Sequence, residues 1–347
     1  MNFVHNTGLF FKSIFKCNRN QKYLYETSIK SRNFQSNPTR SIDVLFFGTD
    51  KFSLASLRAL VNEQKHSRTV RKLAVVTSFK NSSNPVKKLA CAENLDCFDW
   101  PISSDVCKKY DLGVVVSFGH LIPASIISSL PYGMINVHGS LLPRWRGAAP
   151  IIYAILNGDT CTGITIMRIL PKHFDIGEII AQQEVPISKD CLMPELHDTM
   201  SNVGADLLIK CLPDIESRLK NASQQNPDHV TYAPKVMPEL AQVNWNSSAL
   251  EIYNLYRALY SFKPLATRWN DRQVRITKMM YSSSDAVSTR PPGSVEYNKL
   301  DKYLKVICGN GCSVRVLNLG LEGKKVMSAN EFYNGFLSKV KDKSYFV

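Results

Sequence analysis

Short apolar runs alternate with stretches of helical periodicity between residues 42 and 160. Apolar runs that end at glycine or polar residues are typical of buried strands, and apolar residues three or four apart are typical of helices. The pattern predicts strands at residues 44–47, 73–77, 113–117 and 134–138, separated by helices at residues 53–63, 86–94, 124–130 and 148–157. Such alternation indicates a mostly parallel, Rossmann-like α/β sheet, in which ligands bind beyond the carboxyl ends of the strands.

The pattern changes along the second half of the chain. Strands are predicted at residues 163–169 and 179–185, the second returning antiparallel, and a helical stretch at residues 192–219 closes the first domain. Residues 222–229 are polar, contain Pro227 and resemble a linker. Beyond them the sequence predicts helices at residues 249–262 and 330–337 and short strands at residues 266–269, 273–281, 294–297, 303–308 and 313–319. Five short strands with an added helix predict an OB-like β-barrel, a fold that commonly binds oligonucleotides.

Length and charge divide the chain in the same way. Its 347 residues suffice for two domains, and no apolar run approaches the length of a membrane-spanning helix. The net charge of +14 comes to +6 in residues 1–41, zero in residues 42–234 and +8 in residues 235–347. A neutral middle suits chemistry on a small substrate, and a basic C-terminal region suits a polyanion such as nucleic acid. Taken alone, the C-terminal charge is equally compatible with a role in solubility.

Residues 1–41 have the composition of a targeting segment. Apolar residues between Leu9 and Phe15 are interleaved with Lys12 and Lys16, and Glu26 is the only acidic residue. An amphipathic segment poor in acidic residues predicts a mitochondrial transit peptide, and therefore a location in the matrix. The lysines that interrupt the apolar segment disfavour a secretory signal. The alternative is a disordered basic tail without a targeting role.

Two further patterns exclude common classes of protein. The nine cysteines are scattered, none forms C-x-x-C, and Cys308 and Cys312 have no histidine nearby. This favours reduced, packed thiols over a disulfide framework or a zinc site. The segment G-T-D-K-F-S after the first strand has one glycine where the nicotinamide fingerprint needs G-x-G-x-x-G, which disfavours a dehydrogenase.

Candidate chemistry is concentrated where the strand at residues 134–138 ends. Asn136 and His138 are two residues apart, so their side chains project from the same face of a strand. The loop at residues 141–147 follows, with two arginines around Trp145. An amide donor and an imidazole at a strand end suit a site where a carbonyl oxygen gains negative charge. For N-x-H alone, a buried strand whose Asn and His satisfy backbone groups is the alternative.

The longer stretch at residues 135–150, I-N-V-H-G-S-L-L-P-R-W-R-G-A-A-P, resembles the signature of the folate-dependent formyltransferases, and most closely that of the members that formylate methionyl-tRNA. Similar segments follow in the expected order, among them S-F-G-H-L-I-P at residues 117–123, F-D-I-G-E at residues 174–178 and T-Y-A-P-K at residues 231–235. The resemblance extends over about residues 43–329. It implies a formyltransferase domain at residues 42–221, a linker at residues 222–234 and an OB-like, tRNA-binding domain at residues 235–347.

The resemblance also implies a reaction and a catalytic triad. The formyl group of 10-formyltetrahydrofolate moves to the α-amine of methionine on initiator tRNA, and no metal or redox cofactor takes part. By resemblance, Asp175 completes a triad with Asn136 and His138, although the family more often has L-D-T-G-D in this loop. Asn and His would donate to the oxyanion of the tetrahedral intermediate. Asp175 would orient the imidazole and relay the amine proton through a water.

Predictions about the binding residues rest on the resemblance as well. Ser140, Leu141, Leu142 and Pro143 match the folate contacts of the family, and a role in shaping the turn is the alternative. Arg144 and Arg146 have three possible partners, namely folate carboxylates, tRNA phosphate or acidic side chains. Lys324 and Lys325 are candidate phosphate contacts, although a solvated surface lysine is the better explanation for any one of them.

One departure from the family concerns tRNA. Bacterial members carry a long Gly- and Arg-rich insertion after the second strand, whereas residues 78–85 here contain a single base, Lys80. Recognition of the acceptor end by this loop, with Lys80 as a contact, must therefore differ from the bacterial mode or be weaker. Two other functions stay open. Another user of 10-formyltetrahydrofolate would not need the basic C-terminal domain, and a binding protein without turnover would not need the triad.

Overall fold

The computed structural model describes residues 41–67, 69–80, 83–283, 286–340 and 344–347. The predicted transit peptide lies outside these residues, except for Ser41 at its end. No helix in the described ranges is long and apolar enough to cross a membrane.

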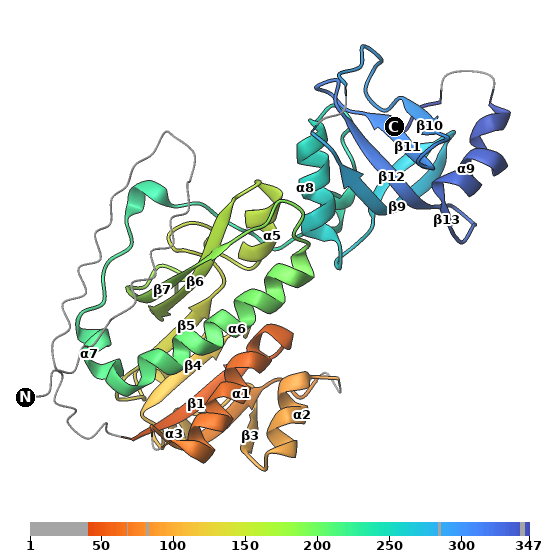
Figure 1. Ribbon diagram of the computed structural model, residues 1–347. Helices are drawn as coiled ribbons and strands as arrows, with labels where there is room; N and C mark the ends of the chain where they lie inside the picture. The colour runs from red at the N-terminus through yellow and green to blue at the C-terminus, as the bar shows by residue number, and fades with distance from the viewer. Residues whose placement is uncertain (1–40, 68, 81–82, 284–285, 341–343) are drawn as a thin grey trace, which may run out of the picture. The chain divides into compact units, whose positions relative to one another are not determined.

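A seven-stranded sheet organises the first part of the described chain (Figure 1). Its strand order is β3-β2-β1-β4-β5-β6-β7, parallel from β3 to β5 and antiparallel at β6 and β7. The strands are β1 (Ile42–Gly48), β2 (Val70–Thr77), β3 (Asp96–Asp99), β4 (Leu112–Val116), β5 (Met134–His138), β6 (Cys161–Arg168) and β7 (Ile179–Pro186). The predicted mostly parallel sheet is confirmed, and β7 returns antiparallel to β6 as predicted.

Both faces of this sheet are buried, because successive residues along its strands point to opposite faces and are apolar on both. In β1, Val44 and Phe46 belong to one apolar cluster, and Leu45 and Phe47 belong to a second one. Helices α1 and α6 supply part of the first cluster, and α4 supplies part of the second. The helices are α1 (Lys51–His66), α2 (Pro85–Ala92), α3 (Ser104–Cys107), α4 (Ala124–Ile127), α5 (Pro150–Leu156), α6 (Met193–Cys211) and α7 (Ile215–Lys220).

The strand order determines where a ligand can bind. β1 lies between β2 and β4, so the direction of winding reverses there, and sheets of this kind bind ligands at the carboxyl edge beside such a point. β5 ends at this edge, with Asn136 opposite Met167 and His138 opposite Thr165 of β6. The sheet therefore presents the N-x-H pair where α/β proteins bind their ligands.

The C-terminal part of the chain forms a second, six-stranded antiparallel sheet. Its order is β10-β11-β12-β9-β8, with β13 paired to β12. The strands are β8 (Leu265–Trp269), β9 (Arg272–Tyr281), β10 (Val295–Asn298), β11 (Tyr303–Ile307), β12 (Ser313–Leu321) and β13 (Val326–Ser328), with helices α8 (Ala249–Leu259) and α9 (Ala329–Gly335). All five predicted strands are present, and the sheet is compatible with an OB-like barrel.

Local chemistry explains where the helices begin and end. Ser248 and Glu251 form a capping box at the start of α8, where hydrogen bonds to Ser248 lower the pKa of Glu251. The single helix predicted over residues 192–219 is wrong. α6 ends at Cys211, and a 3-10 turn (Leu212–Asp214) separates it from α7. Pro213 lacks the backbone N–H that a continuous helix needs. Further 3-10 turns are Pro227–His229, Pro238–Ala241 and Leu337–Lys339.

None of the cysteines in the described ranges forms a disulfide. Burial raises the pKa of the Cys97 thiol to about 11 and that of Cys308 to about 12. These thiols therefore stay protonated at neutral pH, and Cys308 packs as a small apolar side chain.

Candidate active site

The structure brings together the three residues of the predicted triad. Asp175 Oδ1 lies 3.4 Å from Asn136 Nδ2 and 3.5 Å from His138 Nδ1. The side chains of His138 and Asp175 are 6% and 10% exposed, so little solvent screens their charges. An amide and an imidazole from one strand thus converge on a single carboxylate oxygen that comes from a separate loop.

The imidazole is fixed from its other side. His138 Nε2 lies 3.0 Å from the carbonyl oxygen of Trp145. Because a carbonyl oxygen only accepts hydrogen bonds, this contact requires the proton on Nε2. Nδ1 therefore faces Asp175 and is the nitrogen positioned to exchange a proton there, directly or through a water.

The loop of Asp175 has an unusual backbone. Asp175 has a φ of 56°, in the left-handed region, and its Oδ2 accepts a hydrogen bond of 2.9 Å from the Gly147 amide. A Cβ added to Gly177 would lie 1.8 Å from the Arg168 carbonyl oxygen, so only glycine permits this close approach. The loop is thus held in a conformation that its own sequence does not favour.

The turn at residues 140–143 is connected to β6 and β7 by hydrogen bonds. Ser140 is fully buried and donates 2.6 Å to the Arg144 carbonyl oxygen. Thr165 Oγ1 donates to the Ser140 carbonyl oxygen at 2.6 Å and accepts from the Leu142 amide at 3.0 Å. Gln182 Nε2 donates to both Thr165 Oγ1 and the Leu142 carbonyl oxygen. These contacts support a turn-shaping role for Ser140, and folate contact by residues 140–143 stays a prediction.

The two arginines of the loop have different partners. Arg144 forms two hydrogen bonds to Asp159, of 2.9 and 2.6 Å, and lies over the Trp145 ring at 4.3 Å. The sequence left three possible partners for Arg144, and the structure shows that its partner is an acidic side chain. Arg146 instead contacts an amide, because its Nε and Nη2 donate to Gln225 Oε1 at 3.0 and 2.7 Å. A contact of either arginine with tRNA stays a prediction.

The predicted lysine contacts lie elsewhere in the chain. Lys80 is exposed beyond the end of β2, and Lys324 and Lys325 are exposed in the turn between β12 and β13. They are not part of the triad's hydrogen-bonded cluster, and their contact with tRNA stays a prediction.

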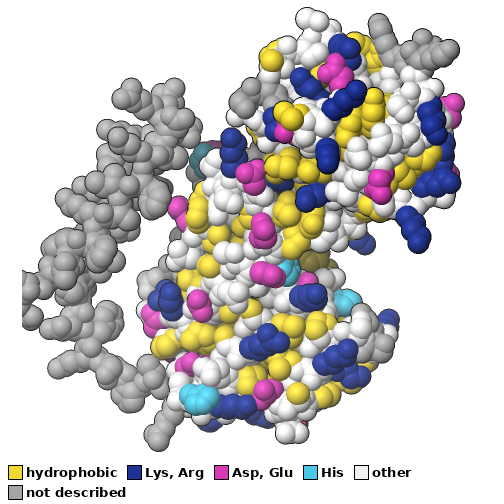
Figure 2. All heavy atoms as spheres, turned by 45° about the vertical axis from the view of Figure 1, so that its right-hand side comes forward, with side chains coloured by type: hydrophobic (Ala, Val, Ile, Leu, Met, Phe, Trp, Pro, Cys, Tyr) yellow, Lys and Arg dark blue, Asp and Glu magenta, His cyan; other side chains and the backbone are white. Residues whose placement is uncertain are grey.

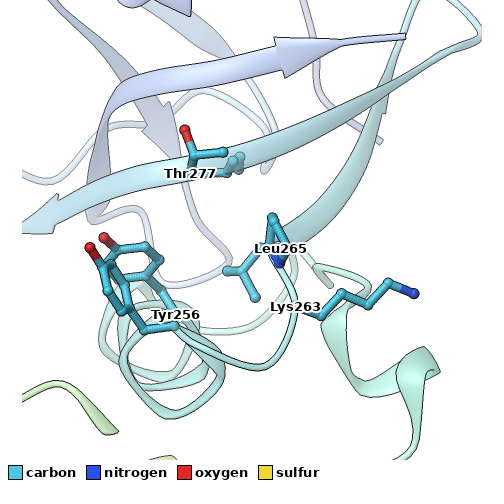
Figure 3. Close-up of a pocket in the computed structure, with 7 residues that line it drawn as sticks. Tyr256, Lys263, Leu265 and Thr277 are labelled. Atoms are coloured by element: carbon cyan, nitrogen blue, oxygen red, sulfur yellow. The ribbon is translucent and has the colours of Figure 1, made fainter. Parts of the chain in front are cut away.

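A pocket of about 240 Å³ lies against the second sheet, lined by Tyr256, Tyr260, Lys263, Pro264, Leu265, Ile276 and Thr277. In Figure 3 the Lys263 side chain extends away from Tyr256 and Thr277, so its charge is not directed into the space between them. None of the lining residues belongs to the triad. Over the ranges that the structure describes, no group of three or more His, Cys, Asp or Glu is placed to hold a metal ion.

Sequence reasoning missed several residues that shape the site. Thr165 and Gln182 lie on strands whose polar positions resemble an ordinary solvated face. Thr231 belongs to the quoted T-Y-A-P-K segment, and its Oγ1 accepts a hydrogen bond of 2.9 Å from the Trp145 amide. The segment was therefore a signal that a residue distant in sequence contacts the catalytic loop.

Comparison with known proteins agrees with this arrangement. Residues 103–212 match the formyl transferase family, and residues 235–337 match the C-terminal domain of formyl transferases. A Rossmann-like sheet with an Asn, a His and an Asp at its carboxyl edge is thus the catalytic domain of a formyl transferase.

Curated relatives narrow the family. The chain is 40% identical over 308 residues to mitochondrial methionyl-tRNA formyltransferase of Homo sapiens, covering 85% of this chain and 77% of the relative. It is 33% identical over 318 residues to methionyl-tRNA formyltransferase of Lactococcus lactis, covering 86% and 96%. The chain belongs to the methionyl-tRNA formyltransferase family and is a formyl-transferring enzyme.

Solved structures agree at the level of the fold. The N-formyltransferase of Helicobacter canadensis, in complex with folinic acid and dTDP-3-aminofucose, has a TM-score of 0.62 and 18% identity, covering 79% of this chain and 98% of that one. At this identity the likeness supports the fold alone.

Proposed function

We propose that this chain transfers the formyl group of 10-formyltetrahydrofolate to the α-amine of methionine on initiator tRNA, giving N-formylmethionyl-tRNA for mitochondrial translation. The observation that carries the proposal is the convergence of Asn136 and His138 on one oxygen of Asp175, in a chain 40% identical to a mitochondrial methionyl-tRNA formyltransferase. The name of that relative, together with the composition of residues 1–41, supports a location in the mitochondrial matrix.

The chemistry needs an oxyanion site and a route for one proton. The neutral amine attacks the formyl carbon, the carbonyl electrons move to oxygen, and the bond from that carbon to the folate nitrogen then breaks. An α-amine titrates near pH ~8, so a neutral fraction exists without a strong base. The donors for the oxyanion are Asn136 Nδ2 and, when it carries a proton, Nδ1 of His138, because Nε2 is hydrogen-bonded to the Trp145 carbonyl oxygen; one such donor is worth roughly 3 to 4 kcal/mol.

Asp175 completes the route of the proton. Its Oδ1 lies near Nδ1 of His138, while its Oδ2 is held by the Gly147 amide. The carboxylate therefore has one oxygen fixed to the backbone and the other beside the reacting groups. From this position it orients the imidazole and passes the amine proton, through a water, to the departing folate nitrogen.

The two substrates are assigned to different parts of the chain. Folate is assigned to the catalytic domain, residues 42–221, with Ser140, Leu141, Leu142 and Pro143 as its contacts. The tRNA is assigned to the OB-like domain, residues 235–347, whose net charge is +8. Figure 2 shows Lys and Arg side chains gathered along one edge of this domain, in the upper part of the view. Lys324 and Lys325 are its proposed phosphate contacts, and Lys80 is the one proposed for the acceptor end.

Alanine substitution of each triad residue tests the assignment. Turnover of charged initiator tRNA should fall by at least about 100-fold in Asn136→Ala, His138→Ala and Asp175→Ala, because each group acts on charge that develops in the transition state. His173→Ala is the matched control, since His173 is exposed and only two residues from Asp175. Near-normal turnover in His138→Ala would refute the assignment.

A further inference from the structure

Residues 223–233, here called the strap, follow α7 and precede α8 (Figure 1). At its start, Ser223 exchanges two backbone hydrogen bonds with Ile179, of 2.7 and 2.9 Å, just beyond the Asp175 loop. At its end, the backbone amide of Arg146 donates to the Thr231 carbonyl oxygen at 2.9 Å. The backbone carbonyl oxygen of Arg146 accepts from the Ala233 amide at 2.7 Å. The strap is therefore hydrogen-bonded to both loops that meet at the triad.

One side chain of the strap joins these two loops. Gln225 is 9% exposed, and its Nε2 donates to the carbonyl oxygens of Asp175 and Gly177, at 2.9 and 2.8 Å. Its Oε1 accepts two hydrogen bonds from Arg146, at 3.0 and 2.7 Å. Carbonyl oxygens only accept and a guanidinium only donates, so the partners determine the orientation of the amide.

The Asp175 loop needs support of this kind. A non-glycine residue with φ of 56° is held in a sparsely populated region of backbone conformation. The Gln225 amide binds the carbonyl oxygen of this strained residue and the carbonyl oxygen of Gly177, two residues further along the loop. Arg146, which holds the other end of Gln225, immediately precedes Gly147, whose amide binds the Asp175 carboxylate. Gln225 therefore connects the backbone of Asp175 to the loop that anchors its carboxylate.

We propose that Gln225 is a positioning residue that holds Asp175 in register with Asn136 and His138. It acts through Asp175 and does not touch substrate, so the inference rests on the proposed role of Asp175. Without Gln225, two carbonyl oxygens lose their donor and the loop relaxes. The carboxylate then moves away from the imidazole, and a misplacement of 1 Å costs on the order of 100-fold in rate.

Gln225→Met removes the amide and keeps the length of the side chain. We expect kcat to fall about 10- to 100-fold, with little change in KM for charged tRNA or for 10-formyltetrahydrofolate. Gln224→Met is the matched control, because Gln224 is exposed and its side chain donates to the surface carboxylate of Glu178, at 3.0 Å. Wild-type kcat in folded Gln225→Met, or an equal loss in Gln224→Met, would overturn the inference.

Gln225→Glu provides a second variant in case Gln225→Met does not fold. It keeps an acceptor for Arg146 but turns a carboxylate oxygen toward two carbonyl oxygens. The expected result is again a loss of kcat with unchanged KM values. Wild-type kcat in folded Gln225→Glu would overturn the inference.

A double-mutant cycle separates positioning from general destabilisation. If Gln225 acts through the Asp175 carboxylate, Gln225→Met should cause no further loss of single-turnover rate in an Asp175→Ala background. Additive losses would show a role independent of Asp175 and would overturn the inference. The failure of the proposed function looks different, because Asp175→Ala would then retain wild-type turnover. An inactive Asp175→Ala with a fully active Gln225→Met would overturn the positioning role alone.

Discussion

Replacing Gly177 with alanine tests whether the close packing of the Asp175 loop is needed for catalysis. The added Cβ would lie 1.8 Å from the Arg168 carbonyl oxygen and 2.8 Å from its carbon, both backbone atoms that cannot rotate away. The two segments are also joined by a hydrogen bond of 2.9 Å from the Arg168 amide to the Glu178 carbonyl oxygen. They must separate by roughly 1 Å or more, and a 1 Å misplacement of a catalytic group costs about 100-fold in rate.

The loss of stability should leave the protein folded. Overpacking of this kind costs about 1 to 3 kcal/mol of the free energy of unfolding. At about 2 to 4 °C per kcal/mol, that lowers Tm by roughly 2 to 12 °C. The protein should therefore remain folded at 25 °C while kcat falls on the order of 100-fold.

The assay is steady-state formylation of charged initiator tRNA, with thermal unfolding measured on the same samples. Gly133→Ala is the control, because nothing lies within 4 Å of an added Cβ at Gly133; its φ of 64° is left-handed, unlike that of Gly177. That variant should lose some stability and keep its kcat. A normal kcat in Gly177→Ala would refute the reasoning, since the loop would then tolerate the displacement without harm to Asp175.

Three other predictions concern the charge, the targeting segment and the core. Neutralising Lys324 and Lys325 should raise KM for charged tRNA and reduce the log-log salt slope by about 1 per lost phosphate contact; tRNA binding insensitive to salt would contradict this. Deleting residues 2–40 should leave catalysis by the purified protein intact and move the protein to the cytosol, and imaging that still finds it in mitochondria would contradict the transit peptide. The raised pKa of Cys308, about 12, adds stability that is present below pH ~9 and lost as pH rises toward that value. Cys308→Ala should therefore make the fall in unfolding free energy above pH ~9 shallower by about 1.4 kcal/mol per pH unit, and an unchanged slope in denaturant titrations would contradict the burial argument.

Much of the fold follows from local patterns in the sequence. The apolar strands β1, β2, β4 and β5 are buried on both faces, so their continuous apolar runs identify them. β3 was missed because its four residues include two exposed aspartates, and β13 because it has only three residues. Such short edge strands depend on a neighbour for pairing, and a local pattern carries no information about that neighbour.

Only some of the site residues could be predicted from local patterns in the sequence. Asn136 and His138 follow from the alternation of a strand that ends at a loop, whereas Asp175 came only from the family resemblance. The strap was predicted to be part of a linker, because its Gln, Asn, Ser and Pro residues are typical of solvated segments. Gln225 and Thr231 gain their roles from hydrogen bonds to residues 48 to 86 positions away. No local signal distinguishes Gln225 from its exposed neighbour Gln224.

The most direct test of the central claim follows a labelled formyl group from 10-formyltetrahydrofolate in the presence of the purified protein. Two acceptors are compared, initiator tRNA charged with methionine and a dTDP-linked amino sugar. The account predicts that the label appears on the α-amine of methionyl-tRNA, and that His138→Ala reduces this transfer by at least about 100-fold. Label recovered on the amino sugar, or released as formate with methionyl-tRNA left unmodified, would contradict it.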